Sequence, residues 1–133
     1  KWQSYERSAL QKLGIPVHVL GSGFVGILDD NKPLSWHKAH ARKAFQFTKN
    51  LLRSRKYDVL ITDEAVSCVE EGLLTQKDVL ALIKAKSVSV HLVLTGHSAF
   101  PAIIKACDLV TKMTNVKHPY YTEGRTAQRG IDF

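Results

Sequence analysis

The sequence predicts an α/β fold in which helices flank a parallel β-sheet. Two observations carry this prediction: short apolar runs alternate with longer amphipathic segments, and glycine, proline or helix-capping residues stand at many of the junctions. Strands that alternate with helices are typical of parallel sheets. A length of 133 residues suits one domain with one core. We therefore expect a single α/β domain over residues 1–133.

Helices are predicted from periodicity and capping. They span residues 4–13, 36–55, 64–73, 76–85 and a segment opened by Ser98. In the long helix, which Ser35 would cap, residues at spacings of 4, 3 and 4 share one face. These residues are Ala41, Phe45, Thr48 and Leu52. Thr75 and Asp78 resemble a capping box, and Pro101 suits a first helical turn.

Four apolar runs predict the strands. They cover residues 16–20, 58–62, 88–95 and 109–113. Residues 21–33 are predicted as a loop and residues 114–133 as a polar, irregular tail. Ligands of such sheets bind at the carboxyl ends of the strands. The informative residues are therefore Gly21–Gly26, Asp63–Glu64, Thr95–His97 and the tail from Thr114.

Charge is uneven along the chain. Residues 1–56 hold 11 Lys and Arg against 3 Asp and Glu, whereas residues 57–133 hold 8 against 9. A basic half attracts nucleic acid, a nucleoside triphosphate or an acidic protein, although the excess over residues 38–56 equally suits the solvated face of a helix. No apolar run reaches the roughly 18 residues of a membrane span. The start is polar, without a signal peptide, and Lys1 in place of methionine leads us to expect sequence upstream.

Cysteines and histidines suggest no metal site. Cys68 and Cys107 are far apart and form no CxxC pair, so we expect two reduced, buried thiols and a cytoplasmic protein. His37 and His40 lie three residues apart on the long helix, and no carboxylate or thiol joins them at ligand spacing. We expect both at the surface.

Gly21–Gly26 matches the pattern GxGxxG after a predicted strand. A dinucleotide site would need a helix to start at the third glycine, but residues 27–33 read as a loop, and the next strand-end acid, Asp63, is too distant. Two readings stay open. The segment is either a plain surface loop or, because Phe24 and its apolar neighbours lie in it, a binding surface for a flat apolar molecule.

Val59–Glu64 is an apolar strand that ends in two acids. This form is typical of a Walker B segment, in which a strand-end carboxylate serves Mg²⁺ on a nucleotide phosphate. Alternatively, Asp63 or Glu64 caps the next helix. The matching phosphate loop, GxxxxGK[ST], does not occur in the sequence.

Two further segments follow predicted strands. Gly96, after Thr95, would let a ligand approach the backbone, or would simply serve a turn. The tail holds side chains that are cationic or can become so and could close over phosphate: Lys117, His118, Arg125 and Arg129. A packed or disordered C-terminus explains the tail equally well.

Taken together, the motifs resemble the P-loop type of ATP:corrinoid adenosyltransferases over the whole chain. The matching stretches are Gly21-Ser22-Gly23-Phe24, Leu60-Ile61-Thr62-Asp63-Glu64, Val93-Leu94-Thr95-Gly96 with Cys107-Asp108-Leu109-Val110-Thr111, and Val116-Lys117-His118-Pro119-Tyr120 with Ala127-Gln128-Arg129-Gly130-Ile131-Asp132-Phe133. The last resembles the family's Val-Lys-His and Ala-Gln-x-Gly-Ile-Asp terminus and is the most specific.

The resemblance implies a RecA-like P-loop sheet whose phosphate loop and first strands precede Lys1. It also implies transfer of the 5′-deoxyadenosyl group of ATP to cob(I)alamin with release of triphosphate. Mg²⁺ or Mn²⁺ would assist, the protein would form a homodimer, and a reductase or flavodoxin would be a partner. Neither a membrane nor nucleic acid is expected as a partner.

The same resemblance assigns roles to residues. Phe24 would lie against the corrin and help displace its lower ligand, while Asp63 and Glu64 would be catalytic and hold the metal. The positions implied for binding ATP or corrinoid are Gly21, Gly23, Phe24, Thr95, Gly96, His97, Lys117, His118, Arg125 and Gln128.

Four positions depart from the family pattern. Gly26 replaces a tryptophan, His97 an arginine, Lys112 a glutamate and Thr126 a lysine. These departures favour the first of two alternatives to the enzyme that stay open, and the basic first half of the chain suggests the second. One is a non-catalytic relative that binds a corrinoid or nucleotide, and the other is a basic, P-loop-like module that binds nucleic acid.

Overall fold

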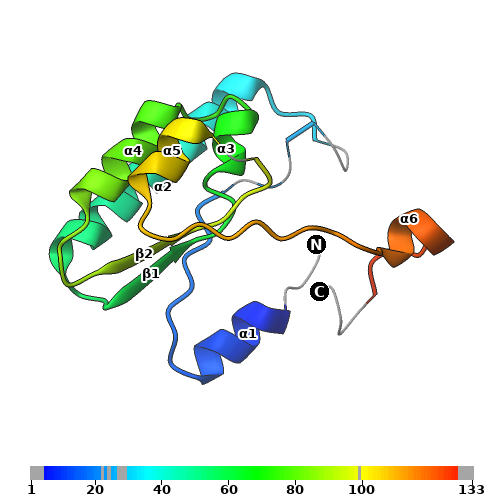
Figure 1. The fold of residues 1–133 in the computed structure, drawn as a ribbon, viewed down its shortest axis with the longest axis horizontal. Helices are drawn as coiled ribbons and strands as arrows, with labels where there is room; N and C mark the ends of the chain where they lie inside the picture. The colour runs from blue at the N-terminus through cyan, green and yellow to red at the C-terminus, as the bar shows by residue number, and fades with distance from the viewer. Residues whose placement is uncertain (1–4, 22, 24, 27–29, 99, 129–133) are drawn as a thin grey trace. The chain divides into compact units, whose positions relative to one another are not determined.

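A computed structural model describes residues 5–21, 23, 25–26, 30–98 and 100–128 (Figure 1). The chain divides into two compact units. The larger comprises Leu20–Val110 and contains the sheet with helices α2 to α5. The smaller comprises Lys1–Val19 with Thr111–Phe133 and contains helices α1 (Tyr5–Lys12) and α6 (Pro119–Glu123).

The sheet of the larger unit has two parallel strands, β1 (Val59–Thr62) and β2 (His91–Leu94). Their register pairs Val59 with His91 and Thr62 with Leu94. Helices α3 (Ser67–Glu70) and α4 (Gln76–Ala85) lie between the strands in the sequence, as a crossover between parallel strands requires. The predicted α/β class is therefore confirmed in the form of a small parallel sheet flanked by helices.

The strands predicted at residues 16–20 and 109–113 do not form, so this part of the prediction was wrong. Both segments run without regular structure. Val19 is 64% exposed and Leu109 85% exposed. An apolar run becomes a strand only when its backbone groups find ladder partners, and neither segment pairs with β1 or β2.

Helix α2 (Leu34–Ser54) matches the long predicted helix. Its buried side, with His37, Phe45 and Leu52, faces the core. The cap was predicted wrongly: Pro33, not Ser35, occupies the N-cap position, and it makes no side-chain hydrogen bond there. The helix therefore depends on tertiary packing at its start rather than on a local cap.

Several exposed positions of α2 are basic. Lysines and arginines lie exposed along it, and the helix contains no Asp or Glu. These side chains are Lys38, Arg42, Lys43 and Arg53. Arg42 also donates to Asp78 of α4 at 2.6 Å. Much of the positive charge of the first 56 residues is thus on a solvated helix face.

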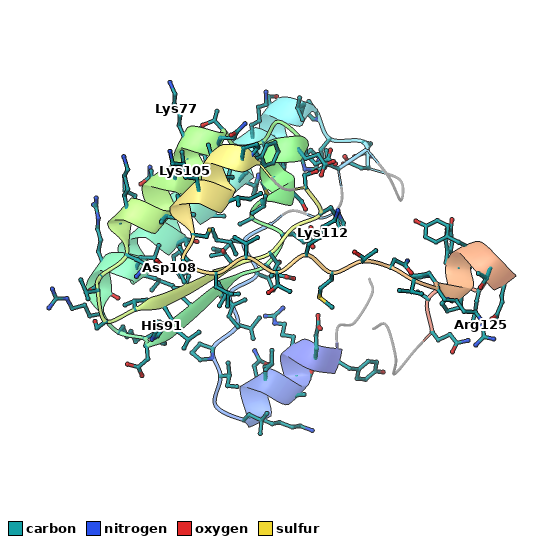
Figure 2. All side chains as sticks on the ribbon, viewed as in Figure 1. Lys77, His91, Lys105, Asp108, Lys112 and Arg125 are labelled. Carbon is teal, nitrogen blue, oxygen red and sulfur yellow. The ribbon has the colours of Figure 1, made fainter. Side chains whose placement is uncertain are left out.

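Helix α4 begins as predicted. Thr75 Oγ1 accepts the Asp78 N–H, and the Asp78 carboxylate accepts the Thr75 N–H at 2.8 Å, which completes the capping box. Figure 2 shows Lys77 projecting from the start of α4. Val79 and Leu82, on the opposite side of the helix, are at most 2% exposed.

Three shorter helices differ from their predictions. Helix α5 (Pro101–Ala106) has Pro101 at its first turn as expected, but its N-cap residue is Phe100 rather than Ser98. Helix α3 covers only four residues of the predicted 64–73. The tail, predicted to be irregular, contains α6, whose N-cap His118 accepts the Tyr120 N–H through Nδ1.

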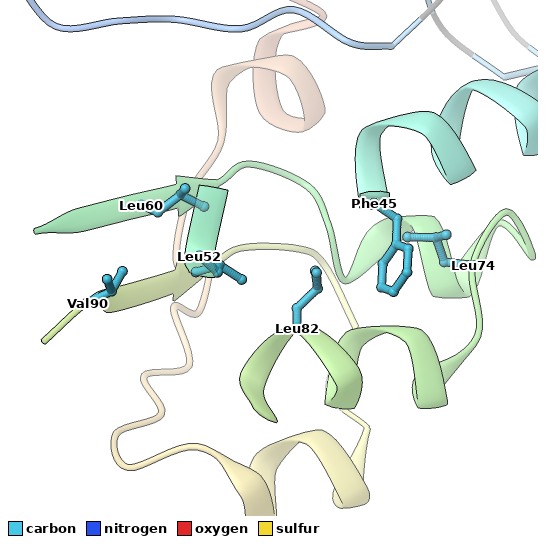
Figure 3. Packing of buried hydrophobic residues seen from close by; sticks show 6 residues of the cluster. All are labelled: Phe45, Leu52, Leu60, Leu74, Leu82 and Val90. Atoms are coloured by element: carbon cyan, nitrogen blue, oxygen red, sulfur yellow. The ribbon is translucent and has the colours of Figure 1, made fainter. Parts of the chain in front are cut away.

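The core lies between the sheet and the helices (Figure 3). Its main cluster joins side chains from α2, α4, both strand regions and the segment before α4: Phe45, Leu52, Leu60, Leu74, Leu82 and Val90. Only one side of β1 is buried: Leu60 is 9% exposed and its neighbour Ile61 66%. Among the described residues, no helix is both long enough and apolar enough to cross a membrane.

Candidate active site

The carboxyl ends of the two strands bring the predicted acids next to the predicted Thr-Gly turn. Because Thr62 pairs with Leu94, Asp63 and Glu64 leave the sheet beside Thr95 and Gly96. Two backbone bonds extend the pairing beyond the strands: the Thr95 N–H donates to the Thr62 carbonyl at 3.3 Å, and the Val66 N–H to the Thr95 carbonyl at 3.0 Å. Residues that are about 30 positions apart in the sequence thus share one site.

The Thr95 hydroxyl connects both acids. It donates to Asp63 Oδ1 at 2.8 Å and accepts the Glu64 N–H, also at 2.8 Å. The side chain of Thr95, the residue that follows β2, therefore fixes the carboxylate of Asp63 and the backbone of Glu64. The sequence predicted Thr95 as a binding residue, and the structure gives it a positioning contact with both acids.

Glu64 has an unusual backbone, with φ at 56°. Left-handed conformations are uncommon for residues other than glycine, asparagine and aspartate, and they persist where neighbours hold them. Here the Thr95 hydroxyl holds the Glu64 N–H, and the Ser67 hydroxyl donates to Glu64 Oε2. The turn between β1 and α3 thus presents the Glu64 carboxylate at the edge of the sheet.

Ser67 is the residue that sequence reasoning missed. Besides its bond to Glu64, its Oγ accepts the His97 N–H at 3.1 Å. The spacing of three residues between Glu64 and Ser67 was a usable signal, since it allows contact across one helical turn. We call Asp63, Glu64, Ser67, Thr95 and His97 the strand-end cluster.

Gly96 is required by packing within this cluster. A Cβ atom placed on it would lie 2.7 Å from the Ser67 nitrogen and 2.7 Å from Val66 Cβ. Real Cβ atoms do not approach so closely, so the turn after β2 fits against the start of α3 only with glycine. The close approach that the sequence suggested at Gly96 is made by the chain itself.

His97 lies beside Glu64 but is only weakly paired with it. Nδ1 of His97 is 3.9 Å from Glu64 Oε2, and the two side chains are 83% and 51% exposed. An exposed pair at this distance contributes little to stability. Both groups are therefore available to a ligand.

The acids fit a divalent cation that is shared with phosphate. Mg²⁺ binds through one or two carboxylates together with waters and substrate oxygens, and Asp63 and Glu64 are exposed and adjacent. Within the described ranges, no three His, Cys, Asp or Glu side chains gather into a closed metal centre. Asp63 and Glu64 could thus supply carboxylate ligands to a divalent cation.

Of the glycine-rich loop, Gly21–Gly26, the structure describes Gly21, Gly23, Val25 and Gly26, whereas Phe24 lies outside the described residues. Gly21 and Gly23 are exposed. Gly26 has φ at 69°, a conformation that glycine adopts freely. The tryptophan that the family pattern carries at this position would strain that backbone.

The prediction that His37 lies at the surface was wrong. His37 is 4% exposed, and its Nε2 lies 2.9 Å from Asp30 Oδ2. The burial follows from its place on the core side of α2, where it is eight residues before Phe45. His40 is half-buried: its Nδ1–H donates to the Trp36 carbonyl at 2.9 Å, and its ring stacks on that of Trp36.

The tail residues lie in the smaller unit. His118 caps α6, and Arg125 donates to Glu123 at 2.5 Å. Lys117 is exposed, and Gln128 also belongs to this unit. Closure of these four side chains over Asp63 and Glu64 stays a prediction.

Both cysteines are free and half-buried. Burial raises the pKa of the Cys68 thiol, and Glu64 and Glu71 raise it further. Burial likewise raises the pKa of Cys107, with a contribution from Asp108. Both thiols are thus less buried than the sequence led us to expect.

Comparison with known proteins gives consistent matches. A sequence model of the family described as ATP:corrinoid adenosyltransferase BtuR/CobO/CobP matches residues 1–133. A protein named corrinoid adenosyltransferase from Pseudomonas aeruginosa is 34% identical over 119 residues, which are 90% of this chain and 57% of that protein. Another of the same name from Sinorhizobium sp is 32% identical over 117 residues, 87% of this chain and 53% of that protein. The chain thus spans about half the length of these relatives.

Proposed function

Because the chain belongs to the ATP:corrinoid adenosyltransferase family, we propose that it serves transfer of the 5′-deoxyadenosyl group of ATP to cob(I)alamin or another corrinoid. In this reaction the electron pair of Co(I) forms a bond to the 5′ carbon. The bond from that carbon to the triphosphate oxygen breaks, and its electron pair leaves with triphosphate. The observation that carries the proposal is the acid pair Asp63–Glu64, fixed at the strand ends of a chain that matches the family over its length.

The strand-end cluster supports the nucleotide half of the reaction. Asp63 and Glu64 would hold Mg²⁺ or Mn²⁺, which neutralises charge on the triphosphate as it departs. Thr95 and Ser67 position the two acids through the hydrogen bonds described above. His97 lies 3.9 Å from Glu64 and can donate to a phosphate oxygen when it is protonated.

The glycine-rich loop is proposed to serve the corrinoid half. Phe24 would lie against the corrin ring and help displace the lower ligand of cobalt. Such a contact uses the large apolar area and flat face of an aromatic side chain. Lys117, His118, Arg125 and Gln128 are proposed to contact the phosphates from the tail.

A second candidate is a non-catalytic relative that binds a corrinoid or nucleotide. Two observations favour it. The left-handed backbone of Gly26 does not suit the tryptophan of the family pattern, and His97, in place of arginine, lacks an assured positive charge. The two candidates share a binding site and differ in turnover.

The deciding experiment is an adenosylation assay on the protein made from its natural gene, with its intact mass measured. Cob(I)alamin and ATP are supplied under reducing conditions, and adenosylcobalamin and triphosphate are quantified. We expect both products in equal amounts. Corrinoid binding without either product would favour the non-catalytic relative, and neither binding nor product would refute both candidates.

A further inference from the structure

Asp30 and His37 form a contact that the proposed reaction does not use. Asp30 Oδ2 accepts the Gly26 N–H at 2.9 Å and also faces His37 Nε2 at 2.9 Å. Oδ1 of the same carboxylate accepts the Lys32 N–H at 3.1 Å. One carboxylate thus joins the end of the glycine-rich loop, the segment before α2, and the core side of α2 itself.

The burial of this contact makes it unlike an ordinary surface pair. The side chains of His37 and Asp30 are 3% and 10% exposed. A carboxylate only accepts hydrogen bonds unless it is protonated, so Nε2 of His37 carries the hydrogen that it donates. Loss of His37 would leave Asp30 with its two backbone donors, whereas loss of Asp30 would remove the acceptor of the Gly26 N–H, the Lys32 N–H and His37 Nε2 together.

The position of the contact links it to the corrinoid side of the proposed site. Gly26 comes two residues after Phe24. Helix α2 is the longest helix of the chain as described, and through Phe45 and Leu52 it belongs to the main core cluster. The hydrogen bond from Gly26 to Asp30 therefore connects the end of the glycine-rich loop, which would present Phe24, to a helix that belongs to the core.

We propose that Asp30 and His37 are positioning residues: they fasten Gly26 to α2 and thereby set the place of the glycine-rich loop against the corrinoid. This inference rests on the proposed function for the identity of the ligand, but not for the fastening itself. Neither residue needs to touch the corrinoid. We call the three groups, Asp30, His37 and the Gly26 N–H, the loop anchor.

The fastening is tested first without any ligand. Hydrogen exchange of the Gly26 amide is followed by NMR in the wild type and in Asp30→Ala, His37→Leu and His37→Gln. Asp30→Ala removes the acceptor, and His37→Leu removes a donor to it while keeping an apolar, buried side chain. Both Asp30→Ala and His37→Leu are expected to speed Gly26 exchange about tenfold or more, as for loss of a hydrogen bond to a charged group.

Two variants separate positioning from general loosening of α2. The amide nitrogen of glutamine reaches a similar place to Nε2 of histidine, so His37→Gln is expected to restore slow exchange at Gly26. His40→Leu, on the same helix and half-buried, is the matched control and should leave Gly26 unchanged. Exchange at Gly26 that is unaltered by Asp30→Ala and His37→Leu would overturn the proposal.

The ligand side is then tested by titration with hydroxocobalamin and, separately, with Mg²⁺-ATP. We expect His37→Leu to weaken hydroxocobalamin binding about tenfold and to leave Mg²⁺-ATP binding unchanged, with recovery in His37→Gln. Faster Gly26 exchange with unaltered hydroxocobalamin affinity would overturn the positioning role. If the wild type binds no hydroxocobalamin, the proposed function fails, while the Gly26 measurement still decides whether the fastening exists.

Discussion

The strand-end cluster and the loop anchor hold their parts of the proposed site in different ways. In the cluster, hydroxyl groups of Thr95 and Ser67 tie together two turns that are about 30 residues apart in the sequence. In the anchor, one carboxylate, that of Asp30, gathers donors that lie within seven residues of it. The first arrangement has several independent contacts, and the second depends on a single side chain.

The difference indicates how each region responds to change. Loss of one hydroxyl contact in the cluster leaves the strand register and the backbone bonds of Thr95 and Val66 in place. Loss of Asp30 removes its contacts with Gly26, Lys32 and His37 at once. We therefore expect substitutions in the cluster to act by removing a group that binds the ligand. Substitutions in the anchor should act by displacing the glycine-rich loop.

The largest expected effect tests the chemistry of the cluster. Glu64→Gln keeps an oxygen that can accept from Ser67, so the turn should remain folded, but it removes the charge that would bind the metal. Loss of groups around a metal ligand commonly costs 10- to 100-fold in affinity or activity, so loss of the ligand itself should cost about 100-fold or more. The measurement is Mg²⁺-ATP affinity by calorimetry together with adenosylation rate.

Glu70→Gln is the matched control for that change, because Glu70 is an exposed acid on α3 and its replacement removes the same charge. It should leave both quantities unaltered. Equal affinities in Glu64→Gln and wild type would remove Glu64 from the proposed metal site.

The second prediction concerns how closely the cluster is packed. Gly96→Ala places a methyl group 2.7 Å from the Ser67 nitrogen and from Val66 Cβ, so the turn must move. Overpacking of this kind costs about 1–3 kcal/mol of unfolding free energy, measurable by urea denaturation. In the loop, a Cβ on Gly21 would meet no atom within 4 Å, and Gly21→Ala should change stability little. Equal effects of the two substitutions would contradict the contrast drawn between the regions.

The features that the sequence predicted are those fixed by near neighbours. The capping box at Thr75 and Asp78 needs only four consecutive residues, and it forms as predicted. Strands β1 and β2 were recognised from apolar runs, and the acids after β1 were placed at the right edge of the sheet because parallel strands share that edge.

Features that depend on distant partners were not predicted. Residues 16–20 and 109–113 have strand-like composition, but without a ladder partner they stay irregular. His37 looked like a surface residue because its burial comes from the tertiary packing of its side of α2, although its partner Asp30 is only seven residues away. The link from Ser67 to His97 likewise required the register of the two strands.

The smallest expected effect is the pH dependence of the loop anchor. Hydrogen bonds from the backbone N–H groups of Gly26 and then Lys32 lower the pKa of Asp30 below its ordinary value of 3.8, and His37 contributes in the same direction against the opposing effect of burial. Because the folded-state pKa lies below the unfolded value, the contribution of Asp30 to stability is fully present above pH 3.8. It is lost as the pH falls through the lower folded-state pKa.

The Gly26 amide should therefore stay protected from exchange at pH values just below 3.8, after correction for the intrinsic pH dependence of exchange. Protection should disappear only at still lower pH, as the carboxylate takes up a proton and loses its strength as an acceptor. Among the described residues, Lys32 acts on Asp30 through its backbone N–H, and Lys32→Gln keeps that bond, so it should alter this profile little. Loss of protection already well above pH 3.8 in the wild type would show that another group, and not Asp30, controls the fastening of the loop.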